Sequence, residues 1–310
     1  MKVGVLMGGW SPEKKVSMMS GKNVVEGLRK AGVKAVGVTL TNADKNAQRL
    51  GKRLKAGKFD LVFIALHGTF GEDGQLQALL DKWGIPYTGS GALACGLAMH
   101  KGCSKLVFEA GKLPTAPWVA VHRSTAPKAW AQGVKFPLPW VVKPADSGSA
   151  IGVTLVRDKK AFPAAVRKAF RTSEWAVVER YVAGTEVTVS VLGERALPVI
   201  EILPVNEFYD YDSKYTPGHS AHIIPARIPA SARAKVQALS LKAGKALGCR
   251  DYYRVDLIVP AKGEPQILEV NTAPGMTATS LVPDAAKAAG IAFPALLKRI
   301  CQMALKKGRN

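Results

Sequence analysis

The stretch KVGVLMGGWSPEKKVSMMSGKNVVEGLRKAGVKAVGVTL, residues 2–40, decides the fold class of this chain. It opens with an apolar run of strand length at 2–7, and a glycine pair that predicts a turn follows. Residues 17–31 carry the apolar spacing of a helix, and a second apolar run occupies 33–40. A strand, a helix and a further strand in this order predict two parallel strands joined by a crossover helix.

The same alternation continues beyond residue 40. A basic helix is expected before the next apolar run, LVFIAL at 61–66, so the order β-α-β-α-β predicts a doubly wound parallel sheet over residues 1–91. Ligands of such sheets collect at the carboxyl ends of the strands. Two polar segments fall there, GGWSPE at 8–13 and HGTFGEDG at 67–74.

Two further blocks follow, at 92–178 and 179–310. The first is expected to open with one helix over 92–110 and to continue with strands near Val119 and at 140–143. The second opens with a strand of alternating polarity around Val189, which predicts that one face is buried and the other is not. The chain is therefore predicted to be an α/β protein with a mixed α+β arrangement in its second and third parts.

Composition excludes several protein classes. The chain has 310 residues, 47% of them hydrophobic, enough to form cores in two or three domains. Its longest apolar runs fall far short of the ~20 residues that a membrane helix needs. No signal-peptide pattern follows Met1, so we expect a cytoplasmic protein without membrane contact. The four cysteines stand far apart without nearby histidine partners, which argues against a disulfide framework and a zinc site.

The charge balance raises a nucleic-acid alternative. Lys and Arg number 44 against 23 Asp and Glu, a formal net charge of +21. The basic residues are spread along the chain, however, and no aromatic residues interleave with the densest groups. A solvated basic surface is favoured, and no nucleic-acid partner is expected.

The segment YRVDLIVPAKGEPQILEVN, residues 253–271, predicts a β-hairpin with chemistry on one face. If it turns about Lys262 and Gly263, Asp256 lies across from Glu269 and Arg254 lies across from Asn271, while Val255, Leu257, Leu268 and Val270 face the other way. Opposed carboxylates repel unless a cation lies between them. Two carboxylates and an amide suit Mg²⁺, which usually binds nucleotide phosphates as well, so the pattern points to ATP. The alternative is a polar strand face in solvent.

Three other segments are ambiguous on their own. WVVKPADSGSAIGVTLV, residues 140–156, could bring backbone N–H groups and Lys143 to phosphate oxygens, or could be an ordinary hairpin. Ser11 and Glu13 could serve a site or only cap a helix. His67 follows a buried strand, where a neutral imidazole could simply satisfy a backbone carbonyl.

Taken in order, eight segments form one pattern: GGWSPEKKVSMMSG, HGTFGEDGQLQALLD, PYTGSG, KPADSGSAIGV, ERYVAGTEVTV, FYDYDSKY, RVD and LEVNTAPGMTATSLVP. In this order they resemble the D-alanine-D-alanine ligases of the ATP-grasp superfamily, from about residue 3 to residue 304. The resemblance implies an N-terminal Rossmann-like domain (1–91), a central ATP-grasp subdomain (92–178) and a C-terminal ATP-grasp subdomain (179–310). ATP is then expected between the last two.

The resemblance also implies a set of site residues. Around the nucleotide it implies that Lys101 and Lys143 bind phosphate. It implies that Glu179, Arg180, Tyr181 and Val182 contact the adenine and that Glu186 binds the ribose. Further nucleotide contacts are implied for Ser149, Lys214 and Leu268. For two Mg²⁺ or Mn²⁺ ions it implies the ligands already suggested by the hairpin: Asp256, Glu269 and Asn271. Around the amino acids it implies that Glu13 holds the ammonium group, with His67 beside it, and that Arg254 and the N–H of Gly275 stabilise the oxyanion. It implies that Ser280 and Leu281 form the pocket for a carboxylate. It also implies that the hydroxyls of Ser149 and Tyr215 form a hydrogen-bonded chain with Glu13.

The implied activity is ATP-dependent formation of D-alanyl-D-alanine for peptidoglycan synthesis, through a D-alanyl phosphate, by an enzyme expected to be a homodimer. Residues 208–215 are the candidate lid that keeps water from the acyl phosphate. Alternatives are a ligase that accepts D-lactate or D-serine as second substrate, and a basic nucleic-acid-binding protein with a retired ligase fold. Three residues depart from the family pattern: His100 where Asp is usual, Ala150 where a second Ser is common, and Trp10 in the first glycine turn. His100 leaves the local support of Lys101 in question.

Overall fold

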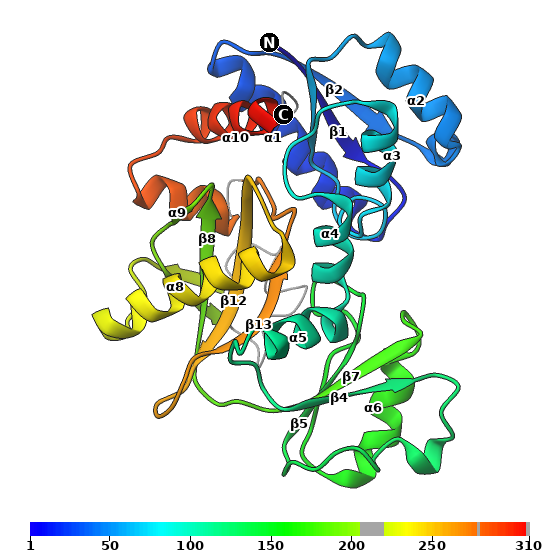
Figure 1. The fold of residues 1–310 in the computed structure, drawn as a ribbon, viewed down its shortest axis with the longest axis vertical. Coiled ribbons are helices and arrows are strands. Elements are labelled where there is room, and N and C mark those ends of the chain that lie inside the picture. The colour runs from blue at the N-terminus through cyan, green and yellow to red at the C-terminus, as the bar shows by residue number, and fades with distance from the viewer. Residues whose placement is uncertain (205–219, 278–279, 308–310) are drawn as a thin grey trace.

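The computed structural model is elongated, with three sheets stacked along its long axis (Figure 1). It describes residues 1–204, 220–277 and 280–307. The N-terminal sheet lies at one end, a sheet built from the second half of the chain lies in the middle, and the sheet of the central block lies at the other end (Figure 1).

The N-terminal sheet is parallel and doubly wound, as predicted. Its order is β2-β1-β3, and the strands pair in register over the following bounds: β1 Lys2–Gly8, β2 Lys34–Leu40 and β3 Leu61–Ile64. Side chains of alternate strand residues enter two separate cores. One core receives α1, and the other receives α2 and α3, with these bounds: α1 Lys14–Lys30, α2 Ala47–Ala56 and α3 Gln75–Trp83.

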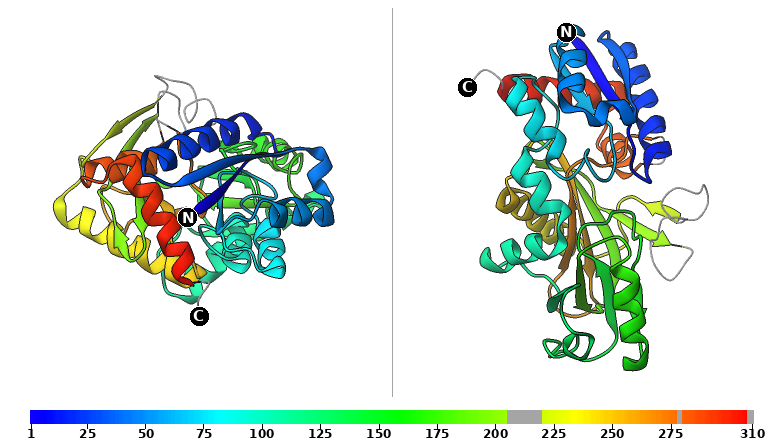
Figure 2. Two further views of the ribbon diagram at one scale, coloured as in Figure 1. Left: turned by 90° about the horizontal axis from the view of Figure 1, so that it is seen from above. Right: turned by 90° about the vertical axis from the view of Figure 1, so that its right-hand side faces the viewer.

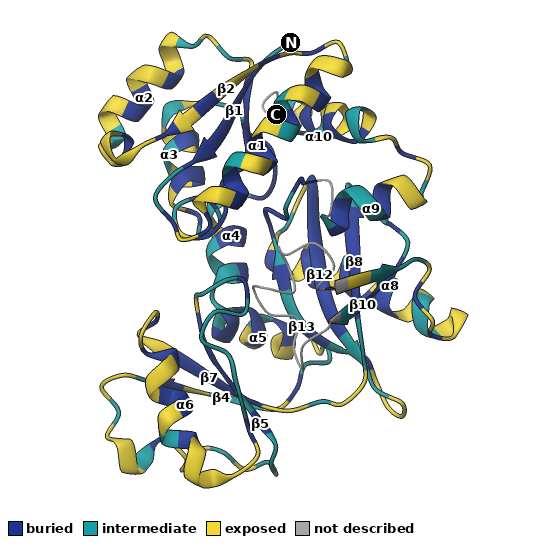
Figure 3. Ribbon diagram, turned by 180° about the vertical axis from the view of Figure 1, so that it is seen from behind, coloured by how far each residue is buried: buried dark blue, intermediate teal, exposed yellow. Residues whose placement is uncertain are grey.

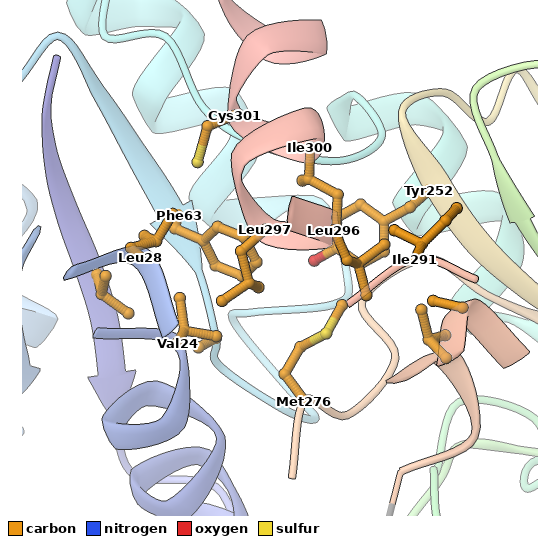
Figure 4. Packing of buried hydrophobic residues seen from close by; sticks show 14 of the residues in the cluster. Val24, Leu28, Phe63, Tyr252, Met276, Ile291, Leu296, Leu297, Ile300 and Cys301 are labelled. Carbon is orange, nitrogen blue, oxygen red and sulfur yellow. The ribbon is translucent and has the colours of Figure 1, made fainter. Parts of the chain in front are cut away.

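The last helix, α10 Phe293–Lys307, returns to this domain and packs against α1 (Figure 2), and α9 Leu281–Ala288 precedes it. Figure 4 shows Leu296 and Leu297 of α10 among Val24 of α1 and Tyr252, the first residue of strand β12 (Tyr252–Val259). Each buried leucine contributes about 1.5–3 kcal/mol, so this core holds the N-terminal and C-terminal parts together. In the described part of the chain no single helix could span a membrane; α9 and α10 pass that test only as a pair bent by 105°.

The central sheet is antiparallel with the order β4-β7-β5-β6. The bounds are β4 Trp118–His122, β5 Trp140–Pro144, β6 Thr154–Val156 and β7 Trp175–Arg180, and α6 Phe162–Ala169 packs on one face. β5 and β6 form the hairpin expected around the Gly-Ser loop. The domain boundaries stay predictions, and the one at residue 179 falls inside β7.

The middle sheet has the order β11-β10-β8-β12-β13, with the short β9 paired to β8. The bounds are β8 Thr185–Leu192, β9 Arg195–Ala196, β10 Ile200–Pro204, β11 Ser220–Ile223, β12 Tyr252–Val259 and β13 Gln266–Asn271, and α8 Ala230–Leu247 covers one face. The prediction that β8 is half buried was wrong. Most of β8 is buried (Figure 3). Val189 on one face and Thr188 and Ser190 on the other are all fully buried, because Thr188 bonds to β12 and α9 also packs against β8.

The predicted single helix over 92–110 is also wrong. It is two helices, α4 Ala92–Met99 and α5 Lys101–Ala110, separated by His100 in an extended conformation with φ −89° and ψ 100°. The imidazole Nδ1 accepts a hydrogen bond of 3.1 Å from the Cys103 N–H, one of the unpaired donors in the first turn of α5. His100 therefore caps α5 and starts it at Lys101.

Candidate active site

Two cavities adjoin where the three sheets meet. The larger, about 450 Å³, lies between the central and middle sheets, and the smaller, about 90 Å³, lies between the N-terminal domain, the β5–β6 loop and the ends of β12 and β13. Lys101 and Glu269 line both. A molecule bound in one cavity would therefore lie next to a molecule bound in the other.

The structure places the sequence-predicted residues in these two cavities according to type. The larger cavity is lined by predicted nucleotide residues and two predicted metal ligands: Lys101, Lys143, Glu179, Arg180, Tyr181, Val182, Glu186, Leu268, Asp256 and Glu269. The smaller is lined by the predicted amino-acid and oxyanion residues and two metal ligands: Glu13, His67, Ser149, Arg254, Gly275, Ser280, Leu281, Glu269 and Asn271. Lys214, Tyr215 and the candidate lid at 208–215 lie outside the described residues. The roles of all these residues stay predictions.

Glu13 does not serve as a side-chain cap of α1. Although it is the N-cap residue, its Oε1 accepts a 2.5 Å hydrogen bond from Ser149 Oγ on the β5–β6 loop. The Ser11 hydroxyl donates to the His67 carbonyl over 2.7 Å. A Cβ on Gly68, whose φ is +72°, would lie 2.7 Å from Glu13 Oε2, so only glycine allows the carboxylate this close. The capping alternative is wrong for these side chains.

His67 belongs to a polar group in the smaller cavity. Its Nδ1 lies 3.3 Å from Glu72 Oε1, and its Nε2 lies 3.0 Å from Ser20 Oγ. Burial by itself lowers the pKa of His67, but the hydrogen bond and charge of Glu72, together with Glu13, raise that pKa above its ordinary value. Glu13, Glu72 and His67 thus give this cavity both acidic and basic groups, which suits an amino acid with its ammonium and its carboxylate.

The β12–β13 hairpin has the predicted register at its chemical end. Asp256 pairs with Glu269 and Arg254 pairs with Asn271. The register shifts between Asp256 and Leu257, so Leu257 lies opposite Ile267 and a bulge leaves Leu268 beside Glu269. The prediction that Leu268 faces away from the polar residues is wrong for this reason, since it lines the larger cavity with Glu269.

Protein cations already pair with the opposed carboxylates. Arg254 donates to both oxygens of Asp256, from Nε and Nη2 over 2.8 Å each, and Thr188 donates to Oδ1 over 2.6 Å. Lys101 Nζ lies 3.5 Å from Glu269 Oε2 and donates to the Ser147 carbonyl over 2.8 Å. The described residues contain no cluster of three or more His, Cys, Asp or Glu side chains that could hold a metal ion.

The residues present nevertheless fit a hard divalent cation. Asp256, Glu269 and Asn271 offer only oxygen donors, and they flank the junction of the two cavities. Each carboxylate oxygen has more than one lone pair, so the bonds from Arg254 and Thr188 leave Asp256 able to accept further contacts. A site that is only partly built from protein ligands would be completed by phosphate oxygens.

A buried carboxylate lies at the floor of the larger cavity. Glu179 Oε1 lies 2.7 Å from Lys143 Nζ and 3.3 Å from Lys105 Nζ. Burial raises the pKa of Glu179, but the charges of Lys105 and Lys143 bring it below its ordinary value. Glu179 is therefore an ionised hydrogen-bond acceptor.

The far end of the smaller cavity is formed by the loop before α9. Ser280 Oγ accepts from the Thr277 N–H over 2.9 Å and lies 2.8 Å from Thr277 Oγ1. A Cβ on Gly275 would lie 2.8 Å from Ser280 Oγ, so the Gly275 backbone approaches that hydroxyl closely. Backbone N–H groups and hydroxyls at the start of a helix suit a carboxylate.

The three departures from the pattern leave the site residues in place. His100 caps α5, whose first residue is Lys101. Ala150 lines the larger cavity, and its φ of +55° follows a φ of +53° at Ser149. Trp10 packs on Phe70 with 4.7 Å between ring centroids.

Sequence reasoning missed four residues: Ser20, Glu72, Lys105 and Thr188. Glu72 lies in the quoted segment HGTFGEDG, five residues after His67, and could have been suspected from its charge alone. Lys105 shares a helix face with Lys101 at spacing i, i+4. Ser20 and Thr188 carry no local signal, because their partners are 47 and 68 residues away.

Comparison with known proteins agrees with this geometry. The family model described as D-ala D-ala ligase N-terminus matches residues 40–90, and the one described as D-ala D-ala ligase C-terminus matches residues 107–302. Curated proteins named D-alanine-D-alanine ligase from Citrifermentans bemidjiense and Geotalea uraniireducens are 47% and 46% identical over 306 residues, which is 99% of this chain and 97% and 96% of theirs. The crystal structure of the D-alanine-D-alanine ligase from Bacillus anthracis complexed with ATP has a TM-score of 0.87 at 34% identity, covering 100% of this chain and 99% of that one. The chain belongs to the D-alanine-D-alanine ligase family.

Proposed function

We propose that this chain is an ATP-dependent ligase that joins two D-alanine molecules into the dipeptide used for peptidoglycan synthesis. The observation that carries the proposal is the pair of adjoining cavities that share Lys101 and Glu269. The larger cavity has a volume and lysine side chains that suit a nucleotide, and the smaller cavity has acidic and basic side chains that suit amino acids. ATP in the larger cavity would place its terminal phosphate beside the first substrate.

In the first step, a carboxylate oxygen of the first D-alanine attacks the γ-phosphorus in line, and ADP leaves. Glu13 holds the ammonium of this substrate, and Ser149 fixes the Glu13 carboxylate. Lys101 and Lys143 neutralise charge on the transferring phosphoryl group. The product is a mixed anhydride, D-alanyl phosphate.

In the second step, the amine of the second D-alanine, after losing a proton, attacks the acyl carbon. Arg254 and the Gly275 N–H stabilise the oxyanion that develops on the carbonyl oxygen. Ser280 and the Leu281 backbone hold the carboxylate of this acceptor. The C–O bond to phosphate then breaks, so dipeptide and inorganic phosphate leave.

Asp256, Glu269 and Asn271 would hold Mg²⁺ or Mn²⁺, with two ions expected. When bound, such ions neutralise charge on the nucleotide phosphates and favour their transfer. Two other expectations belong to the same proposal: the enzyme is a homodimer, and it works in the cytoplasm.

The test is phosphate release from ATP by purified protein with D-alanine, L-alanine, D-serine or D-lactate, with and without a divalent ion. We expect release with D-alanine and a dipeptide by mass spectrometry. Release that requires D-lactate or D-serine would assign a different second substrate. No release with any substrate, together with salt-sensitive binding of DNA or RNA, would replace the proposal by the retired-ligase alternative.

A further inference from the structure

Lys105 is a buried cation that the proposed reaction does not use. Its side chain is completely inaccessible on α5, one turn beyond Lys101, and it lines neither cavity. Its Nζ donates to Thr115 Oγ1 over 2.6 Å, and Thr115 Oγ1 donates to the Ile267 carbonyl of β13 over 3.0 Å. A buried charge is costly, so the fold tolerates Lys105 only because these partners and Glu179 surround it.

Lys105 faces the carboxylate that lines the nucleotide cavity. Both ion pairs of Glu179 in the described part of the chain, to Lys105 and to Lys143, involve Oε1. Glu179 itself lines the larger cavity. Because Lys105 belongs to α5 and Lys143 to β5, the Glu179 side chain is held from two directions.

The ionised state of Glu179 has a consequence for base recognition. A carboxylate can only accept hydrogen bonds, whereas a protonated carboxyl or an amide can also donate. The purine 6-position offers a donor in adenine, its amino group, and an acceptor in guanine, its oxygen. An ionised Glu179 beside that position therefore pairs with a 6-amino purine and repels a 6-oxo purine.

We propose that Lys105 is a positioning residue that holds Glu179 as an ionised acceptor and thereby makes the site select ATP over nucleotides with a 6-oxo purine. This inference rests on the proposed function, because it takes the nucleotide to lie in the larger cavity with its base near Glu179. Lys105 itself touches no substrate. Its effect is on base selectivity and is separate from its contribution to stability.

The test compares ATP with inosine triphosphate, which has a carbonyl oxygen in place of the 6-amino group and an N1–H in place of the N1 acceptor, and which has no 2-amino group. Wild type should prefer ATP strongly in kcat/KM and in binding measured by calorimetry. In K105M the preference should fall by about tenfold or more, because Glu179 becomes easier to protonate. The control is K242M, which removes an exposed lysine from α8 and should keep the wild-type preference.

A merely structural Lys105 would lower kcat/KM for both nucleotides by the same factor, and that result would overturn the proposal. If K105M does not fold, the preference for ATP over inosine triphosphate is measured in E179Q instead, because the glutamine amide has the same shape as the carboxylate and can donate to a 6-oxo group. An unchanged preference in E179Q would show that Glu179 does not read the base. Binding of ATP by a wild type that releases no phosphate with any amino acid would count against the proposed function and leave this inference standing.

Discussion

Replacing His100 by alanine tests whether the imidazole that caps α5 also positions Lys101. The Cys103 N–H donates to His100 Nδ1 over 3.1 Å, and Lys101 is the first residue of the helix. Its backbone N–H donates to the Ala145 carbonyl over 2.7 Å, and its Nζ reaches Ser147 and Glu269. Without the cap the first turn of α5 can fray, and the backbone of Lys101 is then no longer held in one position.

The magnitude follows from the energy of one cap. Removing an N-cap side chain costs about 1 kcal/mol of stability. If that loss falls on the first turn of α5, the fraction of molecules with Lys101 in place decreases by up to about fivefold, because 1.4 kcal/mol corresponds to a factor of ten. We therefore expect KM for ATP to rise by up to about fivefold in H100A and KM for D-alanine to change less.

The assay combines urea unfolding with steady-state kinetics. H100D and H100N should keep KM for ATP near wild type, because Asp and Asn are good caps. N46A is the matched control: Asn46 Oδ1 caps α2 through the Arg49 N–H over 3.0 Å, far from both cavities. It should lose similar stability and keep its KM. Equal KM values for ATP in H100A and N46A would refute the positioning role.

E269Q should lower turnover by about 100-fold or more with an unchanged unfolding transition, because Glu269 lines both cavities; retained phosphate release would reject its metal role. G68A should raise KM for D-alanine by displacing the Glu13 carboxylate, whereas G32A, with a φ of +73° and open space, should change stability alone; equal KM values in both would contradict this. Burial lowers the pKa of Lys105 to about 8, below the ordinary 10.5, so above about pH 8 the unfolded chain binds a proton that the folded chain lacks. Raising the pH from about 8 to about 10 should then raise the free energy of unfolding of wild type relative to K105M, and parallel urea curves would contradict it.

Features set by local pattern were predicted correctly. The β-α-β-α-β order and the opposition of Asp256 and Glu269 both follow from short spacings and a turn near Lys262. The bulge at Leu268 was not predicted, because a shift of one residue leaves the composition of both strands unchanged.

Features set by distant partners were predicted poorly. Thr188 and Ser190 predict a solvent face, yet they are buried because Asp256 and α9 cover them. His100 lies inside an alanine-rich helical pattern, and only the backbone geometry reveals that its ring caps a new helix. Glu72 and Lys105 act through side chains brought together by tertiary folding, so the charge of Glu72 and the spacing of Lys105 from Lys101 draw attention to them without revealing their partners.

The carboxylates of Asp256 and Glu269 on the hairpin require a divalent ion only under certain conditions. Their opposition alone does not require one, because Arg254 neutralises Asp256 and Lys101 pairs with Glu269 within the protein. ATP would add several negative charges beside Glu269, and Lys101 cannot neutralise both the carboxylate and the phosphates. Under the proposed function, the demand for a divalent ion therefore arises when the nucleotide binds, and Asp256, Glu269 and Asn271 are placed to share that ion with phosphate oxygens.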